Sequence, residues 1–184
     1  MTDRTDGGQG RITAPGTVRI ERLLPGPAER LWRYLTESDK RRQWLAAGEM
    51  ELWPGGAVAH LFRHHELSAE PTPERYRDVA TSPAMTGKVT ECDPPRLLAY
   101  TWPGDNGASE VTFELFPEGG SVLLVITHRR LPDDETMVSV AAGWDAHLGV
   151  LIDRLNGREP GGFWSAHERL AAGYREKFAQ GDRS

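Results

Sequence analysis

The sequence is poor in cysteine and has no long hydrophobic run. Cys92 is the single cysteine among 184 residues, so no internal disulfide can form and a reducing compartment is expected. No stretch approaches the roughly 18 apolar residues that span a bilayer, and residues 1–16 lack the apolar segment of a signal peptide. The formal net charge of −5 argues against a nucleic-acid partner. We therefore expect a soluble, cytoplasmic protein without stable membrane insertion.

Motifs for metal binding and nucleophilic catalysis are also missing. There is no C-x-x-C or H-E-x-x-H pattern and no G-x-S-x-G pattern. On a strand, His60 and His64 would share one face about 13 Å apart, too far to ligate one ion at about 2 Å, and His65 would point away. Gly55-Gly56 and Gly119-Gly120 do not open helices, so they are typical of hairpin turns rather than phosphate-binding loops. We predict no metal, no cofactor and no assigned catalytic residue.

The chain contains enough apolar residues for one globular domain, with 38% hydrophobic content. Residues 1–16 are polar and glycine-rich, and we expect them to form a disordered tail. Residues 18–23 alternate and predict a first strand, which Pro25-Gly26-Pro27 would end. Apolar residues at helical spacing predict a helix over residues 28–36, and Ser38 is a candidate cap for a second short helix.

The next part of the chain predicts a hairpin and then a long loop. Residues 50–53 favour a strand, Pro54-Gly55-Gly56 a tight turn, and residues 57–67 the partner strand. Residues 68–83 contain three prolines among charged residues and have few apolar anchors. A loop of this length is unusual in a compact domain, so we expect either a functional lid or a tolerated insertion.

Strand signals return after this loop, at residues 86–91, 97–102, 110–116 and 121–129. Asp93-Pro94-Pro95 separates the first two, because neither proline can donate to a sheet ladder. Residues 97–102 carry apolar side chains on both sides of the strand, which is typical of a strand with both faces covered.

The spacing of the apolar residues then changes from that of strands to that of helices. Residues 137–155 carry a helical apolar stripe, and Asn156-Gly157 is a C-terminal stop signal. Pro160-Gly161-Gly162 predicts a hinge, and residues 163–178 predict a further amphipathic helix. The predicted order is therefore a strand, two short helices, six strands, a long helix and one extra helix.

This order predicts an α+β fold in which a curved antiparallel sheet wraps around a long C-terminal helix, with two short helices after the first strand. Several short motifs, spread over residues 18–156 in the same order, resemble those of the START-like (SRPBCC, Bet v-type helix-grip) superfamily. They are most similar to the branch named after the activator of the heat-shock chaperone ATPase. The motifs are Leu31-Trp32-Arg33-Tyr34-Leu35-Thr36, Arg42-Gln43-Trp44-Leu45, Pro54-Gly55-Gly56, Asp93-Pro94-Pro95 to Thr101-Trp102, Thr127-His128 with Leu131-Pro132, and Gly143-Trp144.

The resemblance implies a START-like domain over residues 17–157. Residues 158–184 would add a C-terminal helix packed on this domain or on a partner subunit, where it would permit a homodimer. The resemblance also implies an internal cavity for a small hydrophobic or amphipathic molecule such as a lipid or polyketide. The candidate cavity residues are Trp53, His60, Phe62, Tyr100, Trp102, Phe113, His128, Trp144 and His147.

Each candidate also has a purely structural interpretation. His128 could present a polar group to a ligand, or it could be a core histidine bonded to a backbone carbonyl or an aromatic neighbour. Trp144 is most simply the residue that seats the long helix on the sheet. His147 lies at the edge of the stripe and could face either the cavity or solvent. Six tryptophans fit an aromatic-lined cavity or a bulky core equally well.

Three functions follow as hypotheses. The leading one is a small-molecule binding protein whose ligand enters past residues 68–83. The second is a cavity enzyme of the cyclase or dehydratase type, which needs an acid or base such as His128 or Glu91 pointing inward with a displaced pKa. The third is a co-chaperone-like interaction module, which predicts an exposed patch on the helix at residues 163–178.

Overall fold

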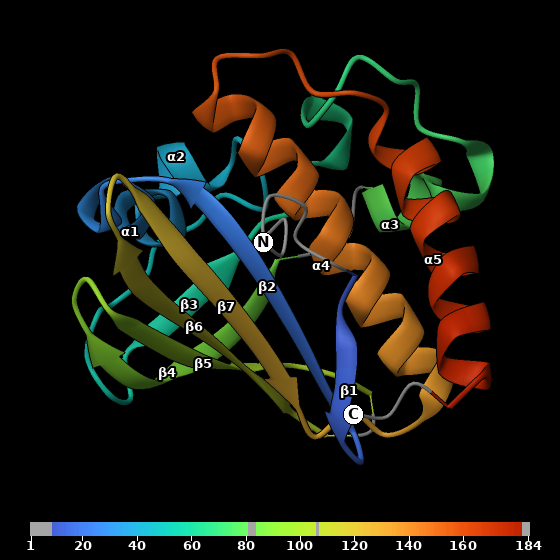
Figure 1. Cartoon of the computed structure of the whole chain (residues 1–184), viewed down its shortest axis with the longest axis horizontal. Helices are drawn as coiled ribbons and strands as arrows, with labels where there is room; N and C mark the ends of the chain where they lie inside the picture. The colour runs from blue at the N-terminus through green and yellow to red at the C-terminus, as the bar shows by residue number, and fades with distance from the viewer. Residues whose placement is uncertain (1–8, 81–83, 106, 182–184) are drawn as a thin grey trace.

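The computed structural model describes residues 9–80, 84–105 and 107–181, and it shows one sheet that wraps around a long helix (Figure 1). The sheet, helix α4 (Asp134–Leu155) and helix α5 (Phe163–Ala179) follow one another from left to right in Figure 1. Helices α1 (Ala28–Thr36) and α2 (Ser38–Arg41) lie beyond one end of the sheet. The predicted α+β helix-grip fold is confirmed.

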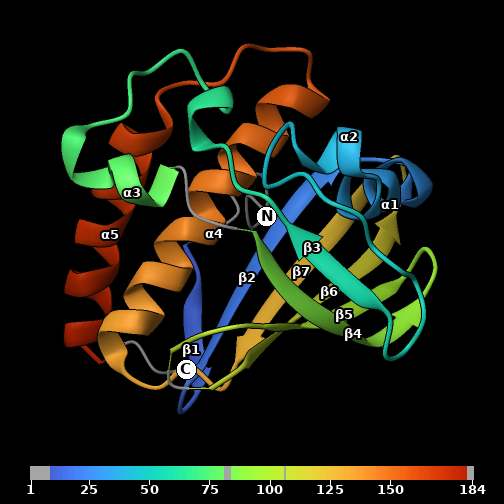
Figure 2. The same cartoon turned by 180° about the vertical axis from the view of Figure 1, so that it is seen from behind.

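In the described part of the chain the sheet has seven strands in the order β1-β2-β7-β6-β5-β4-β3, and every neighbouring pair is antiparallel. Figure 2 shows β3 at one edge of this sheet, beside β4. Strands β5 and β7 have the predicted bounds, and β2, β4 and β6 extend the predicted ones by a few residues. The strands are β1 (Arg11–Ala14), β2 (Thr17–Pro25), β3 (Ala57–His60), β4 (Met85–Asp93), β5 (Leu97–Trp102), β6 (Ser109–Glu118) and β7 (Ser121–Arg129).

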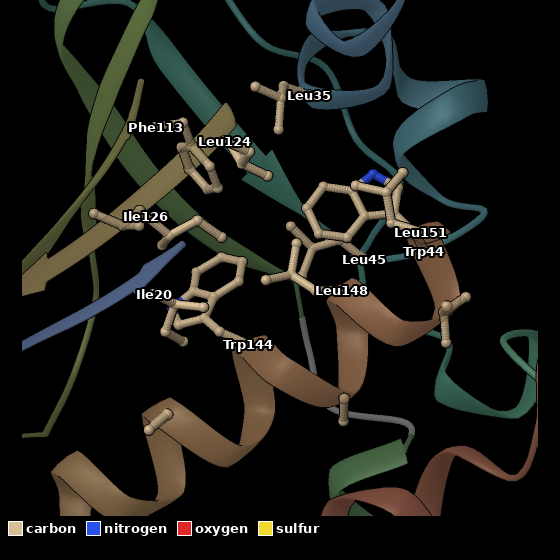
Figure 3. Packing of buried hydrophobic residues seen from close by; sticks show 14 of the residues in the cluster. Ile20, Leu35, Trp44, Leu45, Phe113, Leu124, Ile126, Trp144, Leu148 and Leu151 are labelled. Carbon is tan, nitrogen blue, oxygen red and sulfur yellow. The ribbon is translucent and has the colours of Figure 1, made fainter. Parts of the chain in front are cut away.

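The core lies between the concave face of the sheet and α4. Phe113 on β6 lies opposite Ile126 on β7, and both are buried. Trp144 rises from α4 toward Ile20 and Ile126, which seats the helix on the sheet (Figure 3). Trp44, which follows α2, packs above Leu148 of α4 and closes one end of this core (Figure 3).

Capping residues set the bounds of α4. The carboxylate of Asp133 accepts a hydrogen bond of 2.7 Å from the backbone N–H of Thr136, which satisfies one of the unpaired amides of the first turn. Gly157 follows the helix with a φ of +68°, a backbone conformation that glycine adopts without steric cost. The stop predicted at Asn156-Gly157 is therefore confirmed.

The N-terminal prediction was wrong for the residues that the structure describes. From residue 9 the chain is ordered, and β1 pairs with β2 at the edge of the sheet. Ile12 is buried, and the backbone N–H of Gly10 bonds to the hydroxyl of Tyr174 on α5. Residues 1–8 lie outside the described residues. The polar composition suggested a disordered tail. The prediction failed because Tyr174, which holds this segment in place, lies at the other end of the chain.

The hairpin predicted over residues 50–67 was also wrong in its extent. Met50 makes one isolated bridge to Val58, and residues 51–53 form no strand. The partner strand β3 stops at His60, and a short 3₁₀ helix, η1 (His64–Glu66), follows. The strand spacing that we used for His60 and His64 therefore does not apply.

The predicted loop at residues 68–83 contains two short helical segments and docks on α5. These are η2 (Glu74–Tyr76) and α3 (Arg77–Ala80); residues 81–83 lie outside the described residues. The ring of Tyr76 stacks on that of Trp164 with a centroid distance of 4.5 Å. The side chain of Ser38, the candidate cap, instead accepts a hydrogen bond from the N–H of Gly48, 2.9 Å away.

Candidate ligand cavity

A cavity of about 330 Å³ lies between α4 and one end of the sheet. Its helical wall is a single stripe of α4, because residues three or four positions apart share a helix face. Gly143 sits in the middle of this stripe, and a Cβ atom at that position would meet no neighbouring atom within 4 Å. The missing side chain therefore keeps the space open. The residues of the stripe are Ser139, Val140, Gly143, Trp144 and His147.

The opposite wall comes from strand ends and from the segments that connect strands. Met85 begins β4 and Trp102 ends β5, so the antiparallel pairing brings both to the same end of the sheet. Phe62, Leu45 and His64 complete the inner wall, and Val79 of α3, which is half exposed, lies at the opening. Among the described lining residues none carries a charged aspartate, glutamate, lysine or arginine side chain.

His128 lines the cavity but has both ring nitrogens engaged. The indole N–H of Trp144 donates to Nδ1 at 3.0 Å, so Nδ1 carries no proton. The proton of the neutral ring is then on Nε2, which donates to the hydroxyl of Ser109 at 2.8 Å. Burial lowers the pKa of His128 to about 4. His128 therefore matches the second interpretation given above, a core histidine bonded to an aromatic neighbour.

His147 of α4 and His64 of the opposite wall form a pair of neutral imidazoles whose ring centroids lie 5.5 Å apart. Nδ1 of His147 donates to the backbone carbonyl of Trp44 at 2.7 Å, which leaves Nε2 as an acceptor. A ring nitrogen of His64 makes a backbone hydrogen bond to Val79, while its Nδ1 is buried without a partner among the described residues. Burial is the main cause that lowers the pKa of His147 to about 3 and that of His64 to about 4.

Three of the predicted cavity residues lie one layer behind the wall. The rings of His60 and Tyr100 lie 5.2 Å and 6.4 Å from that of Trp102, and the ring of Phe113 lies 5.4 Å from that of Trp144. These side chains support Trp102 and Trp144 without lining the cavity. Burial, and next the charge of Arg41, lower the pKa of His60 to about 3.

Trp53 was wrongly predicted as a cavity residue. Trp53 is 55% exposed in the turn before β3 and does not line the cavity. The aromatic character of Trp53 suggested a pocket, but residues 51–53 leave the sheet and carry the side chain into solvent. The structure therefore brings together Phe62, Trp102, His128, Trp144 and His147 from the predicted set.

The first turn of α5 is a part of this region that the sequence did not reveal. The ring of Phe163 lies 4.8 Å from that of His147 and 5.3 Å from that of His64. Glu70 holds this turn in place, because its carboxylate accepts hydrogen bonds from the N–H groups of Trp164 and Ser165 at 2.8 and 3.1 Å. The hydrogen bonds from Ser165 and Trp164 lower the pKa of Glu70. No local pattern joins residues 94 positions apart.

Two buried charged groups outside the cavity are fully engaged. Asp145 of α4 accepts hydrogen bonds from Arg22 on β2 and from the hydroxyl of Tyr174 on α5. Burial raises the pKa of Asp145, and Arg22 partly offsets this effect. The guanidinium of Arg41, which is completely buried, donates to the backbone carbonyls of Thr36, Ala46, Gly48 and Ala59.

The described residues contain no group of three histidine, cysteine, aspartate or glutamate side chains placed to hold a metal ion. Glu91, the other candidate acid or base, is exposed on β4 and does not line the cavity. No helix in the described part of the chain is long and apolar enough to cross a bilayer.

Comparison with solved structures shows the same fold in several bacterial proteins. The solution structure of a protein from Bordetella parapertussis has 42% sequence identity and a TM-score of 0.81, over 96% of this chain and 95% of that one. The crystal structure of CalU16 from Micromonospora echinospora has 21% identity and a TM-score of 0.68, over 95% and 98%. DynU16, from the dynemicin biosynthetic locus, has 18% identity and a TM-score of 0.62, over 79% and 49%.

The last two similarities lie below 25% identity and show the fold alone. No curated protein matches the sequence. The model of the family described as activator of Hsp90 ATPase homolog 1-like protein matches residues 25–156, which contain helices α1 and α2, strands β3 to β7 and the whole of α4. The chain therefore belongs to the activator of Hsp90 ATPase homolog 1-like family, within the START-like superfamily.

Proposed function

We propose that this protein binds a small hydrophobic or amphipathic molecule in the cavity between α4 and the sheet. The observation that carries the proposal is a cavity of about 330 Å³ with aromatic and aliphatic walls and no charged side chain among its described lining residues. Cavities of about 300 to 1,000 Å³ with few polar groups are typical of small-molecule sites. DynU16, which shares the fold, comes from the dynemicin biosynthetic locus, and this supports a small organic ligand.

The geometry favours binding over catalysis. His128, the histidine that a cavity enzyme would use, has both ring nitrogens in hydrogen bonds to Trp144 and Ser109. A general base works best when its pKa lies near the working pH. The pKa values of about 4 and 3 for His128 and His147 are far below neutrality.

The exposed apolar patch on α5 that the co-chaperone-like interpretation requires is not present among the described residues. The apolar residues of α5, including Phe163, Trp164 and Tyr174, are buried within the chain. This same packing removes the apolar face that we expected to permit a homodimer through the C-terminal helix. The extra helix instead forms part of the surroundings of the cavity.

The proposal is tested by filling the cavity from Gly143. The probe is N-phenyl-1-naphthylamine, a neutral dye whose fluorescence rises in apolar surroundings. Gly143→Leu places a side chain in the open space and should weaken dye binding by at least about tenfold, equivalent to about 1.4 kcal/mol. Gly149→Leu is the matched control, because Gly149 lies on the same helix, is exposed and also has open space at its Cβ position.

Equal dye affinity in both variants would contradict the proposal, and so would a wild-type protein that does not bind the dye. Native mass spectrometry of freshly purified protein adds a second readout. Additional mass of a few hundred daltons that is lost in Gly143→Leu and retained in Gly149→Leu would identify the natural ligand.

A further inference from the structure

The polar groups of the cavity wall define which hydrogen bonds a ligand can make. His128 has none to offer, because Trp144 and Ser109 occupy both of its nitrogens. Ser139 is exposed and Trp102 is half-buried, so both lie toward the opening. Among the described lining residues, the remaining polar groups are therefore those of His64 and His147, which are more than nine-tenths buried, with residue exposures of 9% and 7%.

Both inner histidines present an unprotonated nitrogen. A backbone carbonyl only accepts, so the 2.7 Å contact with Trp44 places the proton of His147 on Nδ1 and leaves a lone pair on Nε2. Nδ1 of His64 has no hydrogen-bond partner among the described residues, so we assign the backbone hydrogen bond of this ring to Val79 to Nε2, which leaves Nδ1 unprotonated. A buried acceptor without a partner costs about 1 to 3 kcal/mol, which a ligand donor would recover.

The rest of the described wall is aromatic and aliphatic. The rings of Phe62, Trp102 and Trp144 line the cavity, and Phe163 lies 4.8 Å from His147 and 5.3 Å from His64. Such rings favour offset or edge-to-face contacts with another aromatic group. An ionic ligand would lose its hydration without meeting an opposite charge, since no described lining residue is acidic or basic apart from the neutral imidazoles.

We propose that the cavity takes a neutral, hydroxylated aromatic molecule of the phenol class, whose hydroxyl donates to Nε2 of His147 or Nδ1 of His64. This inference rests on the proposed function, because it names the chemistry of the ligand that the cavity binds. The aromatic ring lies against the indoles of Trp102 and Trp144, and the hydroxyl lies toward α5.

The test compares three probes of nearly equal size by isothermal titration calorimetry at pH 7.5. 2-Naphthol carries the donor, 2-methoxynaphthalene has the same oxygen without the proton, and 2-naphthoate carries a negative charge. A net hydrogen bond of about 0.5 to 1.5 kcal/mol predicts that 2-naphthol binds roughly 2- to 12-fold tighter than the methyl ether. 2-Naphthoate should bind more weakly than either.

Two variants remove the acceptors while keeping the structural hydrogen bonds. His147→Asn retains an N–H near the Nδ1 position for the carbonyl of Trp44, and His64→Gln retains one near the Nε2 position for Val79. The double variant should reduce the preference for 2-naphthol over 2-methoxynaphthalene to about one. His65→Gln is the matched control, because His65 is exposed and does not line the cavity; it should keep the full preference.

The ratio of the two affinities separates the two proposals. If 2-methoxynaphthalene binds as tightly as 2-naphthol, or if 2-naphthoate binds best, the phenol inference is wrong while the cavity still binds apolar molecules. An unchanged preference in the double variant would also overturn it. If none of the three probes binds, the proposed function itself fails at this cavity.

Discussion

The two sides of α4 bury polar side chains in opposite ways. Asp145 faces β2 and α5, and both of its carboxylate oxygens accept hydrogen bonds, from Arg22 and from Tyr174. His147, two residues further along, faces the cavity and makes a single hydrogen bond to the backbone of Trp44. The Asp145 side joins three elements of the fold, whereas the His147 side keeps an unpaired acceptor.

This difference separates structure from function within one helix. A buried polar group with every partner in place stabilises the fold, and removing one partner leaves the others unsatisfied. A buried polar group with an unused acceptor weakens the fold by a small amount, unless a ligand supplies the missing donor. The predictions below act on one side or the other.

Lowering the pH should change the free energy of unfolding more than any substitution does. Protonation of the buried histidines should destabilise the fold, whereas protonation of Asp145 should stabilise it. The folded pKa values of about 3 for His60 and His147, and about 4 for His64 and His128, lie below the unfolded value of 6.5. The unfolded chain therefore binds more protons below pH 6.5, and the stabilisation present above that pH is lost as the pH falls toward 4.

Each pKa unit corresponds to about 1.4 kcal/mol per group, so four such groups exceed the stability of an ordinary domain. We expect the protein to unfold by about pH 4 to 5. Asp145 opposes this trend, because its raised folded pKa makes protonation favour the folded state. Urea unfolding followed by circular dichroism between pH 8 and pH 5 measures the slope. A stability that stays constant from pH 7 to pH 5 would show that the four rings are not held neutral.

Asp145→Ala breaks the paired side of α4. The side chain of Asp145 is 1% exposed and that of Arg22 is 13% exposed, so the substitution leaves a buried guanidinium and the Tyr174 hydroxyl without this acceptor. Loss of one partner of a buried ion pair typically costs about 3 to 5 kcal/mol. We expect a decrease of this size in the free energy of unfolding, measured with urea at pH 7.5.

His147→Asn is the matched substitution on the cavity side and should cost clearly less, because its one backbone hydrogen bond is retained. The comparison fails if the two variants are destabilised equally. Dye binding should respond in the reverse order, with a larger change for His147→Asn than for Asp145→Ala.

Trp144→Phe should lower the free energy of unfolding by less than Asp145→Ala does. It keeps a ring between α4 and the sheet but removes the N–H that donates to Nδ1 of His128. An unsatisfied buried acceptor costs about 1 to 3 kcal/mol. Thermal unfolding should show this loss, and the imidazole NMR signals of His128 should shift because its tautomer is no longer fixed. Unchanged His128 signals would mean that this hydrogen bond does not select the tautomer.

Much of the fold could be predicted from local patterns. Strands β5 and β7 and the C-terminal stop of α4 were placed correctly, because alternation and turn residues act over a few positions. Residues 50–53 show where this fails. Met50 makes one bridge and Trp53 points into solvent, although the same spacing of apolar residues is compatible with a strand.

The candidate site was predicted in part for a similar reason. The helical spacing of α4 predicted that Trp144 and His147 lie near one face, and the alternation of β7 predicted that His128 points inward. All three line the cavity. The sequence did not reveal that Phe163 reaches His147 and His64, because this requires α5 to fold back along α4. Glu70, which holds the first turn of α5, lies in a segment that had the composition of a loop.

The sequence by itself determined strands β4 to β7, helices α4 and α5 and the apolar stripe of α4, whereas the open space at Gly143 depends on the tertiary packing. Only the tertiary structure decided which buried polar groups have partners. The carbonyl that fixes the tautomer of His147 belongs to Trp44, 103 residues away, and the partners of Asp145 come from β2 and α5. Hydrogen bonds act over about 3 Å, so chain segments with no local relationship acquire this chemistry only when packing brings them together.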